Sequence, residues 1–189
     1  MNLQSIFNSL VSTSIVFFLS TAANAAEGGK FEIKSNLKSG QSIPADYYAN
    51  VFGCTAKNLS PALEWRNPPE GTKSFAITVH DESAPTDSGF WHYVLINIPA
   101  SVSKIDVGDL SQGKIPQGSA EMMTDAGKPG YFGPCPPVGR KHTYKFTVHA
   151  LKVEKLEVPN SSTPGFVSFN LWANSLGKTS FILTAGPRK

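Results

Sequence analysis

The first 25 residues, MNLQSIFNSLVSTSIVFFLSTAANA, lack any charged side chain, although the whole chain carries 17 Lys and Arg residues and 14 Asp and Glu residues. An apolar run at 10–19 is short for a membrane span, and it leads into Ala23-Asn24-Ala25, a small-x-small cleavage pattern. We therefore expect a secretory signal peptide at 1–25 and a single domain at 26–189. The segment also lacks the basic residue usual near the start of a signal peptide, so an N-terminal membrane anchor stays open.

Beyond residue 25 the sequence lacks any apolar segment long enough to cross a membrane. It also lacks a cluster of basic residues, because the Lys and Arg side chains are scattered and the net charge is only +3. These absences argue against a mature membrane-spanning protein and against nucleic acid as a partner. The expected location is periplasmic or secreted.

Cysteine is scarce, with only Cys54 and Cys135 in the chain. An exported protein meets an oxidising compartment, and two cysteines allow only one intramolecular pairing. We expect a disulfide between them, with two buried free thiols as the alternative. A metal site has less support because there is no C-x-x-C spacing.

The alternation of strand and helix that marks a parallel α/β fold is missing as well. Short segments with a period of two follow one another, separated by Pro and Gly clusters, at 31–35, 61–65, 74–81, 91–99, 143–151 and 178–186. This pattern predicts a mainly β protein, an antiparallel β-sandwich with a few short helices. Three segments each place apolar residues on one face: Phe75, Ile77 and Val79; His92, Val94, Ile96 and Ile98; and Tyr144, Phe146, Val148 and Ala150.

One helix is predicted near residues 165–176, followed by Gly177 as its terminator. The residues expected on one helix face are Phe166, Phe169, Leu171, Trp172 and Leu176. The stretch 101–129 has no clear period and is long for a connection, so we expect an ordered excursion near a site. The tryptophans Trp65, Trp91 and Trp172 are expected in the core or in a pocket wall.

Titratable groups gather at strand ends. Asp81 and His92 flank one short connection and should lie on neighbouring strands at the same sheet edge. A loop rich in Pro and Gly, 130–139, then delivers His142 at the start of another strand. Loops that converge on a rigid sheet are where binding sites usually form. His80 and His149 lie inside strands without such a context and are expected to be structural.

Several ordered motifs together resemble the phosphatidylethanolamine-binding protein family, with the bacterial Raf-kinase-inhibitor-like branch the most similar. They are N-L-S-P-A-L-E-W at 58–65, D-x-x-A-P at 81–85, W-H-Y at 91–93, P-G-Y-x-G-x-C-P-P-x-G at 129–139 and H-x-Y at 142–144. The resemblance covers nearly the whole of residues 26–189.

The resemblance implies a two-sheet β fold with a small pocket at one edge that binds anions such as phosphate, acetate or phosphorylated head groups. Carried over by motif, the ligand-binding residues would be Asp81, Pro85, His92, Pro136, His142 and Tyr144. Trp91, Gly133 and Cys135 would form the pocket wall. No catalytic residue, metal or cofactor is implied. Two imidazoles can donate N–H bonds to an anion. Asp81 would repel phosphate, so we expect it to orient a histidine, with a shared ligand proton as the alternative.

The sequence departs from the family pattern in two places. The usual D-P-D-x-P is replaced by Asp81-Glu82-Ser83-Ala84-Pro85, which loses a proline and an acid. The usual N-D-aromatic-G is replaced by Thr124-Asp125-Ala126-Gly127, which loses an aromatic side chain. These changes leave the identity of the ligand open more than they affect the fold.

Three functional hypotheses remain. The leading one is a non-enzymatic protein that binds a small anion or a phosphorylated head group and modulates a partner protein. The second is an inhibitor of a kinase or protease, or a host-interaction protein. The third is a metal-dependent hydrolase built on Asp81, His92 and His142, a permissible ligand set. It has the least support, because no H-E-x-x-H or G-x-S-x-G motif is present.

Overall fold

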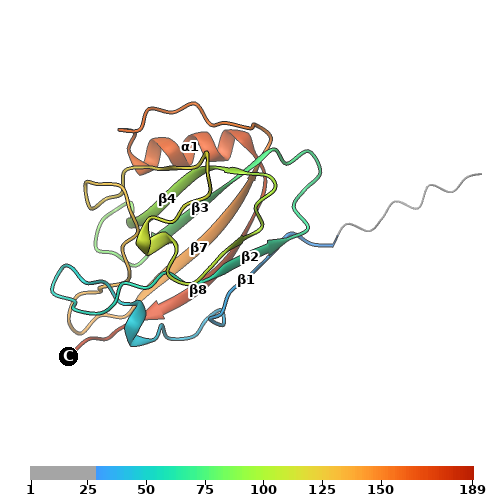
Figure 1. The fold of residues 1–189 in the computed structure, drawn as a ribbon. Helices are drawn as coiled ribbons and strands as arrows, with labels where there is room; N and C mark the ends of the chain where they lie inside the picture. The colour runs from blue at the N-terminus through green and yellow to red at the C-terminus, as the bar shows by residue number, and fades with distance from the viewer. Residues whose placement is uncertain (1–28) are drawn as a thin grey trace, which may run out of the picture.

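Two antiparallel sheets form the molecule in the computed structural model, which describes residues 29–189 (Figure 1). The predicted signal peptide at 1–25 lies outside these residues. The first sheet has the order β1-β2-β5 and the second the order β6-β4-β3-β7-β8. The strands are β1 (Glu32–Lys34), β2 (Leu63–Arg66), β3 (Ser74–Asp81), β4 (Phe90–Pro99), β5 (Lys104–Ile105), β6 (Ala120–Glu121), β7 (His142–Leu151) and β8 (Ser175–Ala185). The prediction of a mainly β fold is confirmed.

Three helical elements complete the fold. They are α1 (Pro164–Asn174) and the short 3₁₀ helices η1 (Ala45–Tyr47) and η2 (Leu110–Gln112). Within residues 29–189, no helix is both long and apolar enough to span a bilayer.

The main core lies between the two sheets. Alternate residues of β3 and β7 point into it, as the period of two predicts. They meet the side chains of the smaller sheet, where the ring of Trp65 packs edge-on against Phe75 with 5.3 Å between centroids. The predicted inward sets of 74–81 and 143–151 are therefore confirmed.

The opposite face of the larger sheet is buried under α1, which lies across it in Figure 1. Val167 and Leu171 of the helix pack on Ala76, Val94 and Ile96 of the sheet. Because both faces of this sheet are covered, its central strands are apolar on both sides.

The predicted face of β4 is wrong for that reason. Val94 and Ile96 point toward α1, whereas Ile98 belongs to the core between the sheets. The register of β3 with β4 shifts between Phe75 and Ile77 and again between Val79 and His80. Each irregularity reverses the side on which the following residues lie, so a simple alternation cannot describe this strand.

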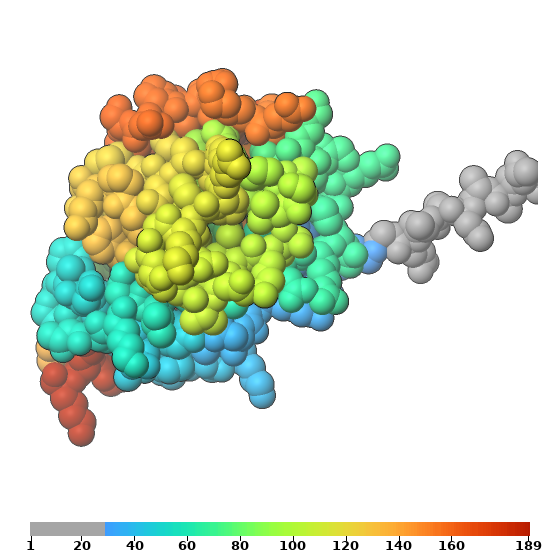
Figure 2. All heavy atoms as spheres, viewed as in Figure 1, coloured from blue at the N-terminus to red at the C-terminus, as the bar shows by residue number. Residues whose placement is uncertain are grey.

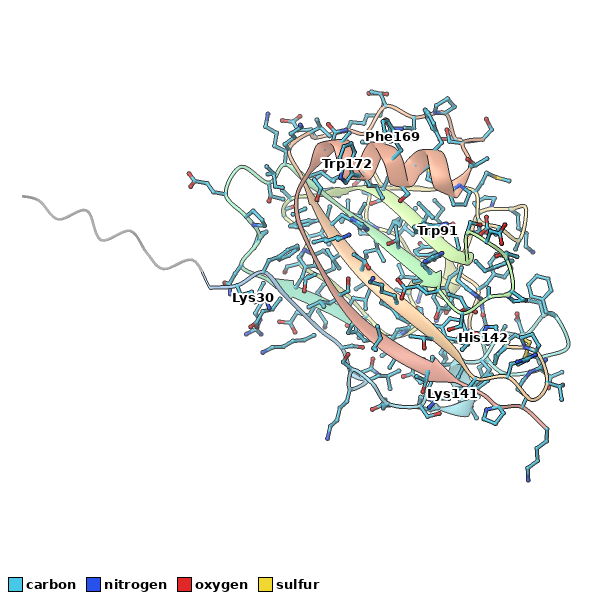
Figure 3. The ribbon with its side chains drawn as sticks, turned by 180° about the vertical axis from the view of Figure 1, so that it is seen from behind. Lys30, Trp91, Lys141, His142, Phe169 and Trp172 are labelled. Carbon is cyan, nitrogen blue, oxygen red and sulfur yellow. A yellow bond between two sulfur atoms is a disulfide. The ribbon has the colours of Figure 1, made fainter. Side chains whose placement is uncertain are left out.

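The helix α1 also differs from its prediction. The residues that it buries are Pro164, Val167 and Leu171. The aromatic side chains predicted to share one helix face, Phe166, Phe169 and Trp172, are 51%, 61% and 74% exposed, and Figure 3 shows Phe169 and Trp172 on the helix. The placement of Trp172 in the core or a pocket wall is wrong, whereas Trp65 is buried as predicted.

The helix ends earlier than predicted. Asn174 is its last residue, and β8 begins at Ser175. Gly177 does not terminate the helix, because it lies within β8 opposite Ala150. A Cβ atom at Gly177 would come within 2.9 Å of the Pro69 side chain, which gives this glycine a packing role.

The stretch 101–129 is ordered, as predicted, and contains β5, η2 and β6. It covers much of the front of the molecule, as the yellow-green and yellow spheres show in Figure 2. The Asp125 carboxylate accepts a hydrogen bond of 2.8 Å from the backbone N–H of Trp91, which ties this stretch to the start of β4.

Candidate functional site

One end of the larger sheet gathers the titratable residues that the sequence predicted together. Asp81, the last residue of β3, pairs with Phe90 at the start of β4 and with Tyr144 near the start of β7. His142 begins β7, and His92 follows Phe90 in β4. Neighbouring antiparallel strands thus bring residues about 60 positions apart to the same edge.

These residues surround a pocket of about 170 Å³, which we call the histidine pocket. It is lined by Phe52, Asp81, Ala84, Pro85, Phe90, His92, Cys135, Pro136, Pro137, His142 and Tyr144. All six residues predicted to bind a ligand are in this lining, and so is Cys135. Their role in binding a ligand stays a prediction.

A β-bulge places His92 in the pocket. Val79 pairs with Tyr93 and His80 pairs with Trp91, so His92 has no partner on β3. Such an extra residue bends the strand and redirects its side chain. The ring of His92 lies 5.0 Å from Phe90 and 5.1 Å from Tyr144, centroid to centroid.

Trp91 does not line the pocket, although the sequence placed it in the wall. Its ring packs with His80, 4.3 Å between centroids, beside the cluster under α1. Adjacent residues of a strand point to opposite faces, so with His92 turned into the pocket Trp91 points away from it. His80 and His149 also lie outside the pocket; their Nε2 atoms contact the carbonyl of Ser88 and the hydroxyl of Thr78.

His92 is neutral at pH 7 in this arrangement. Burial lowers the pKa of its imidazole to about 4, against a smaller opposing effect of the Asp81 carboxylate. The Nδ1 atom lies 3.0 Å from the backbone carbonyl of Phe132, which can only accept a hydrogen bond. The proton of the neutral ring is therefore on Nδ1, and Nε2 offers a lone pair to the pocket.

His142 is held by Asp81 instead. Its Nδ1 atom lies 2.7 Å from Asp81 Oδ2, and both side chains are almost fully buried, at 6% and 4% exposed. The other oxygen, Oδ1, accepts a 2.9 Å hydrogen bond from the backbone N–H of Ser83. The carboxylate thus has its partners within the protein and fixes the ring so that Nε2 is left for a ligand, the orienting role expected for Asp81.

Tyr144 supplies a hydroxyl to the same pocket. Burial raises the pKa of its phenol, and the neighbouring Asp81 carboxylate raises it further. The hydroxyl therefore keeps its proton throughout the physiological range and can donate a hydrogen bond.

The loop 130–139 forms one wall through Cys135, Pro136 and Pro137. The predicted disulfide between Cys54 and Cys135 is present, with 6.0 Å between the Cα atoms. Phe52, which the sequence did not single out, is brought to the pocket mouth by its position two residues before Cys54. The even cysteine count was the signal that could have found it.

Gly133 does not line the pocket and supports the wall from behind. Its backbone N–H donates a 2.7 Å hydrogen bond to Asn58 Oδ1. A Cβ atom at this position would collide with the carbonyl oxygen of Tyr47 and lie 3.0 Å from the backbone nitrogen of Ala49. The glycine is needed because the loop passes close to the backbone of residues 47–49.

The geometry also bears on the predicted metal alternative. Across residues 29–189, no three His, Cys, Asp or Glu side chains are arranged so that they could hold a metal ion.

The comparisons with known proteins agree with this fold and with the motifs. Residues 33–185 match the family model described as phosphatidylethanolamine-binding protein. The chain belongs to the phosphatidylethanolamine-binding protein family. This match confirms the resemblance on which the site residues were predicted.

Bacterial members of the family are similar over most of their length. The UPF0098 protein YbcL of Escherichia coli K12 is 41% identical over 171 residues, which are 88% of this chain and 92% of YbcL. The UPF0098 protein YbhB of the same organism is 40% identical over 150 residues, 78% of this chain and 94% of YbhB.

A solved structure confirms the architecture. The crystal structure of E. coli YbcL, described as a new member of the mammalian PEBP family, matches with a TM-score of 0.80 at 40% identity. The match covers 84% of this chain and 99% of the other.

Proposed function

We propose that this protein is a non-enzymatic binding protein whose histidine pocket holds a phosphate or a phosphorylated head group. The observation that carries the proposal is the pair of buried histidines, each fixed through Nδ1 and each with Nε2 left for a ligand. Tyr144 adds a hydroxyl donor. The name of the family describes binding of a phospholipid, which is the same ligand chemistry.

The small volume of the pocket, about 170 Å³, favours a compact ligand group over a large one, and its walls are mostly apolar. Phe52, Phe90, Pro85, Pro136 and Pro137 enclose it, so a bound anion is partly removed from water. Hydrogen bonds to a charged group are stronger in such a setting than at an open surface. The neutral state of His92 further favours an acidic group that brings a proton with it, because Nε2 can then accept that proton in a hydrogen bond.

Thermal unfolding with and without O-phosphoethanolamine tests this function. Ligand that binds only the folded chain stabilises it by RT ln(1 + L/Kd), where L is the ligand concentration, so the melting temperature rises with the logarithm of this concentration once it exceeds Kd. We expect a rise in the wild type and none in His92→Ala. His149→Ala is the matched control, because it removes a half-buried histidine outside the pocket; it should keep the rise. A rise that persists in His92→Ala would refute the site.

The disulfide and the N-terminal sequence bear on the location of the protein in the cell. We propose that it works in the periplasm or outside the cell, since a disulfide persists in an oxidising compartment and residues 1–25 have a signal-peptide pattern. Mass spectrometry of the protein from the periplasmic fraction should find Ala26 as its first residue and two fewer hydrogens than the dithiol form. A reduced, uncleaved chain in the cytoplasm would contradict this location.

A further inference from the structure

A second hollow adjoins the histidine pocket and has a different character. Its volume is about 480 Å³, and we call it the basic hollow. It is lined by Ser83, Pro85, Pro137, Arg140, Lys141 and His142. Pro85, Pro137 and His142 line both spaces, so the two hollows lie side by side.

The two spaces divide the charged groups between them. The lining of the histidine pocket contains no Lys or Arg, and its one carboxylate, Asp81, contacts His142. That pocket suits an acidic group of low net charge. The permanent positive charges stand in the basic hollow, on Arg140 and Lys141. Figure 3 shows Lys141 and His142 at the same end of the sheet.

These two cations are available to a ligand. Among residues 29–189, neither Arg140 nor Lys141 takes part in a salt bridge. The two carboxylates at the adjoining end of the neighbouring strand β3 are already engaged, because Asp81 bonds His142 and Ser83, and Glu82 pairs with Lys145 at 3.0 Å.

The backbone that carries the cations is fixed. The N–H of Arg140 bonds the carbonyl of Pro137 at 3.1 Å, which closes a turn with Gly139 in the left-handed conformation, φ 75°. The N–H of Gly139 bonds the carbonyl of Arg188 at 3.0 Å, so the C-terminal segment supports the turn. Arg140 and Lys141 therefore start from a set position beside His142, and only their side chains have to order on binding.

We propose that the basic hollow is a second subsite, and that the natural ligand is a phosphate ester that carries a second acidic group. One acidic group enters the histidine pocket, and the other lies between Arg140 and Lys141. An ammonium group at the second position, as in an ethanolamine phosphate, would meet two positive charges there and would be repelled. The inference rests on the proposed function, because it assigns the ligand class of the same site.

Isothermal titration with three soluble probes tests the subsite. Phosphoglycolate has a phosphate and a carboxylate, O-phosphoethanolamine has a phosphate and an ammonium, and inorganic phosphate has neither addition. We expect phosphoglycolate to bind about tenfold tighter than the other two, since it alone reaches the basic hollow with a charge-assisted hydrogen bond. Equal affinity for the three probes would overturn the second subsite and leave the proposed function standing.

Paired variants separate a local contact from a general effect of charge. Arg140→Gln with Lys141→Gln should weaken phosphoglycolate about tenfold and change the affinity for inorganic phosphate less than about twofold. Lys73→Gln with Lys152→Gln removes the same charge at the other ends of β3 and β7 and should leave both affinities as in the wild type. If the first pair weakens every probe alike, the cations act only through the overall field, and the subsite is refuted.

Vesicles identify the source of the ligand chemistry. Phosphatidylserine vesicles present a phosphate, a carboxylate and an ammonium on a membrane, whereas phosphatidylethanolamine vesicles present a phosphate and an ammonium, so the two head groups differ by the carboxylate. Cosedimentation with the first and not with the second, lost in the Arg140→Gln Lys141→Gln variant, supports the subsite with a lipid head group as its ligand. Selective binding of phosphoglycolate without sedimentation supports it with a free metabolite. Failure to bind any probe, soluble or lipid, would overturn the proposed function itself.

Discussion

Asp81 and His142 lie 61 residues apart in the sequence and meet through a 2.7 Å contact between Oδ2 and Nδ1 at the ends of neighbouring strands. Both side chains are withdrawn from water. A buried carboxylate beside an imidazole fixes the orientation of the ring and places a negative charge beside it, so the acidic residue of an anion site aids binding through its neighbour.

The variant Asp81→Asn separates these two contributions. The amide oxygen of asparagine can still accept from His142 Nδ1, but the negative charge beside the ring is gone. We expect the affinity for phosphate to fall about tenfold, as measured by titration calorimetry at pH 7. Glu82→Gln is the control, because Glu82 pairs with Lys145 and does not line the pocket. Tighter binding in Asp81→Asn would show that Asp81 acts by repulsion.

Binding of a phosphomonoester should strengthen as the pH falls from 8 to 6. His92 Nε2 carries a lone pair and no proton in the free protein, since the pKa of this imidazole is lowered to about 4. A hydrogen bond between this nitrogen and a dianionic ester requires a proton that neither group carries, so binding takes up one proton. The affinity therefore rises by up to about tenfold for each unit by which the pH falls. The second pKa of a phosphomonoester is about 6, so the gain should level off below that value.

The sulfate ester of ethanolamine shows which partner holds this proton. It has no titratable proton in this range, so its affinity stays constant if the ligand supplies the proton. It rises with falling pH if His92 takes the proton up. A constant affinity for both esters between pH 8 and 6 would contradict proton uptake on binding.

The same histidines make the folded chain sensitive to acid. Burial lowers the pKa of both His92 and His149 to about 4, so between pH 6.5 and 4 the unfolded chain binds protons that the folded chain does not. The free energy of unfolding is therefore highest above pH 6.5 and declines as the pH falls toward 4, by on the order of 3 kcal/mol for His92 alone. Urea midpoints measured across this range should show the decline, and His149→Gln should make it shallower.

How far the sequence predicted this structure depended on where the chain keeps a regular period. In β7 the alternation of Tyr144, Phe146 and Val148 is unbroken, and their placement in the core was predicted correctly. In β4 the pattern reads equally regularly, but two bulges reverse it; Asn97, in the left-handed region at φ 60°, marks one of them, and no residue type marks the other, beside His92. Pairing with β3 decides those positions, and it is a property of the folded sheet.

The clustering of the candidate site residues was predicted better than the elements that carry them, whereas their role in binding stays a prediction. Ordered motifs at consistent spacing brought Asp81, His92 and His142 together without any knowledge of the bulge that turns His92 inward. For the helix, the element was predicted but its buried face was not. A stripe of aromatic residues suggested that face, but the aliphatic residues Val167 and Leu171 pack on the sheet instead. Close packing on a sheet selects by shape, which a hydrophobic pattern does not contain.

Gly133→Ala tests whether the pocket wall is supported from behind. The added methyl group would collide with backbone atoms of Tyr47 and Ala49, which cannot turn aside as a flexible side chain would. We expect a loss of about 1–3 kcal/mol in the free energy of unfolding, measured in urea, together with weaker phosphate binding. Gly165→Ala is the control, because nothing lies within 4 Å of its Cβ position in α1; it should be neutral or slightly stabilising. Equal stability of the two variants would refute the packing role.

Reduction of the disulfide should affect stability and binding together. The bond closes a loop of 81 residues, for which chain entropy gives about 4 kcal/mol of stabilisation. It also joins Cys135, in the pocket wall, to the segment that carries Phe52 at the pocket mouth. Cys54→Ala with Cys135→Ala should therefore unfold at lower urea concentration and bind phosphate more weakly, since the wall must order on binding.

The oxidised wild type treated with dithiothreitol, with two free thiols verified by mass spectrometry, should behave like the double variant. A fully reduced protein with unchanged affinity would show that the prolines alone keep the wall in place, and that the disulfide acts on stability only.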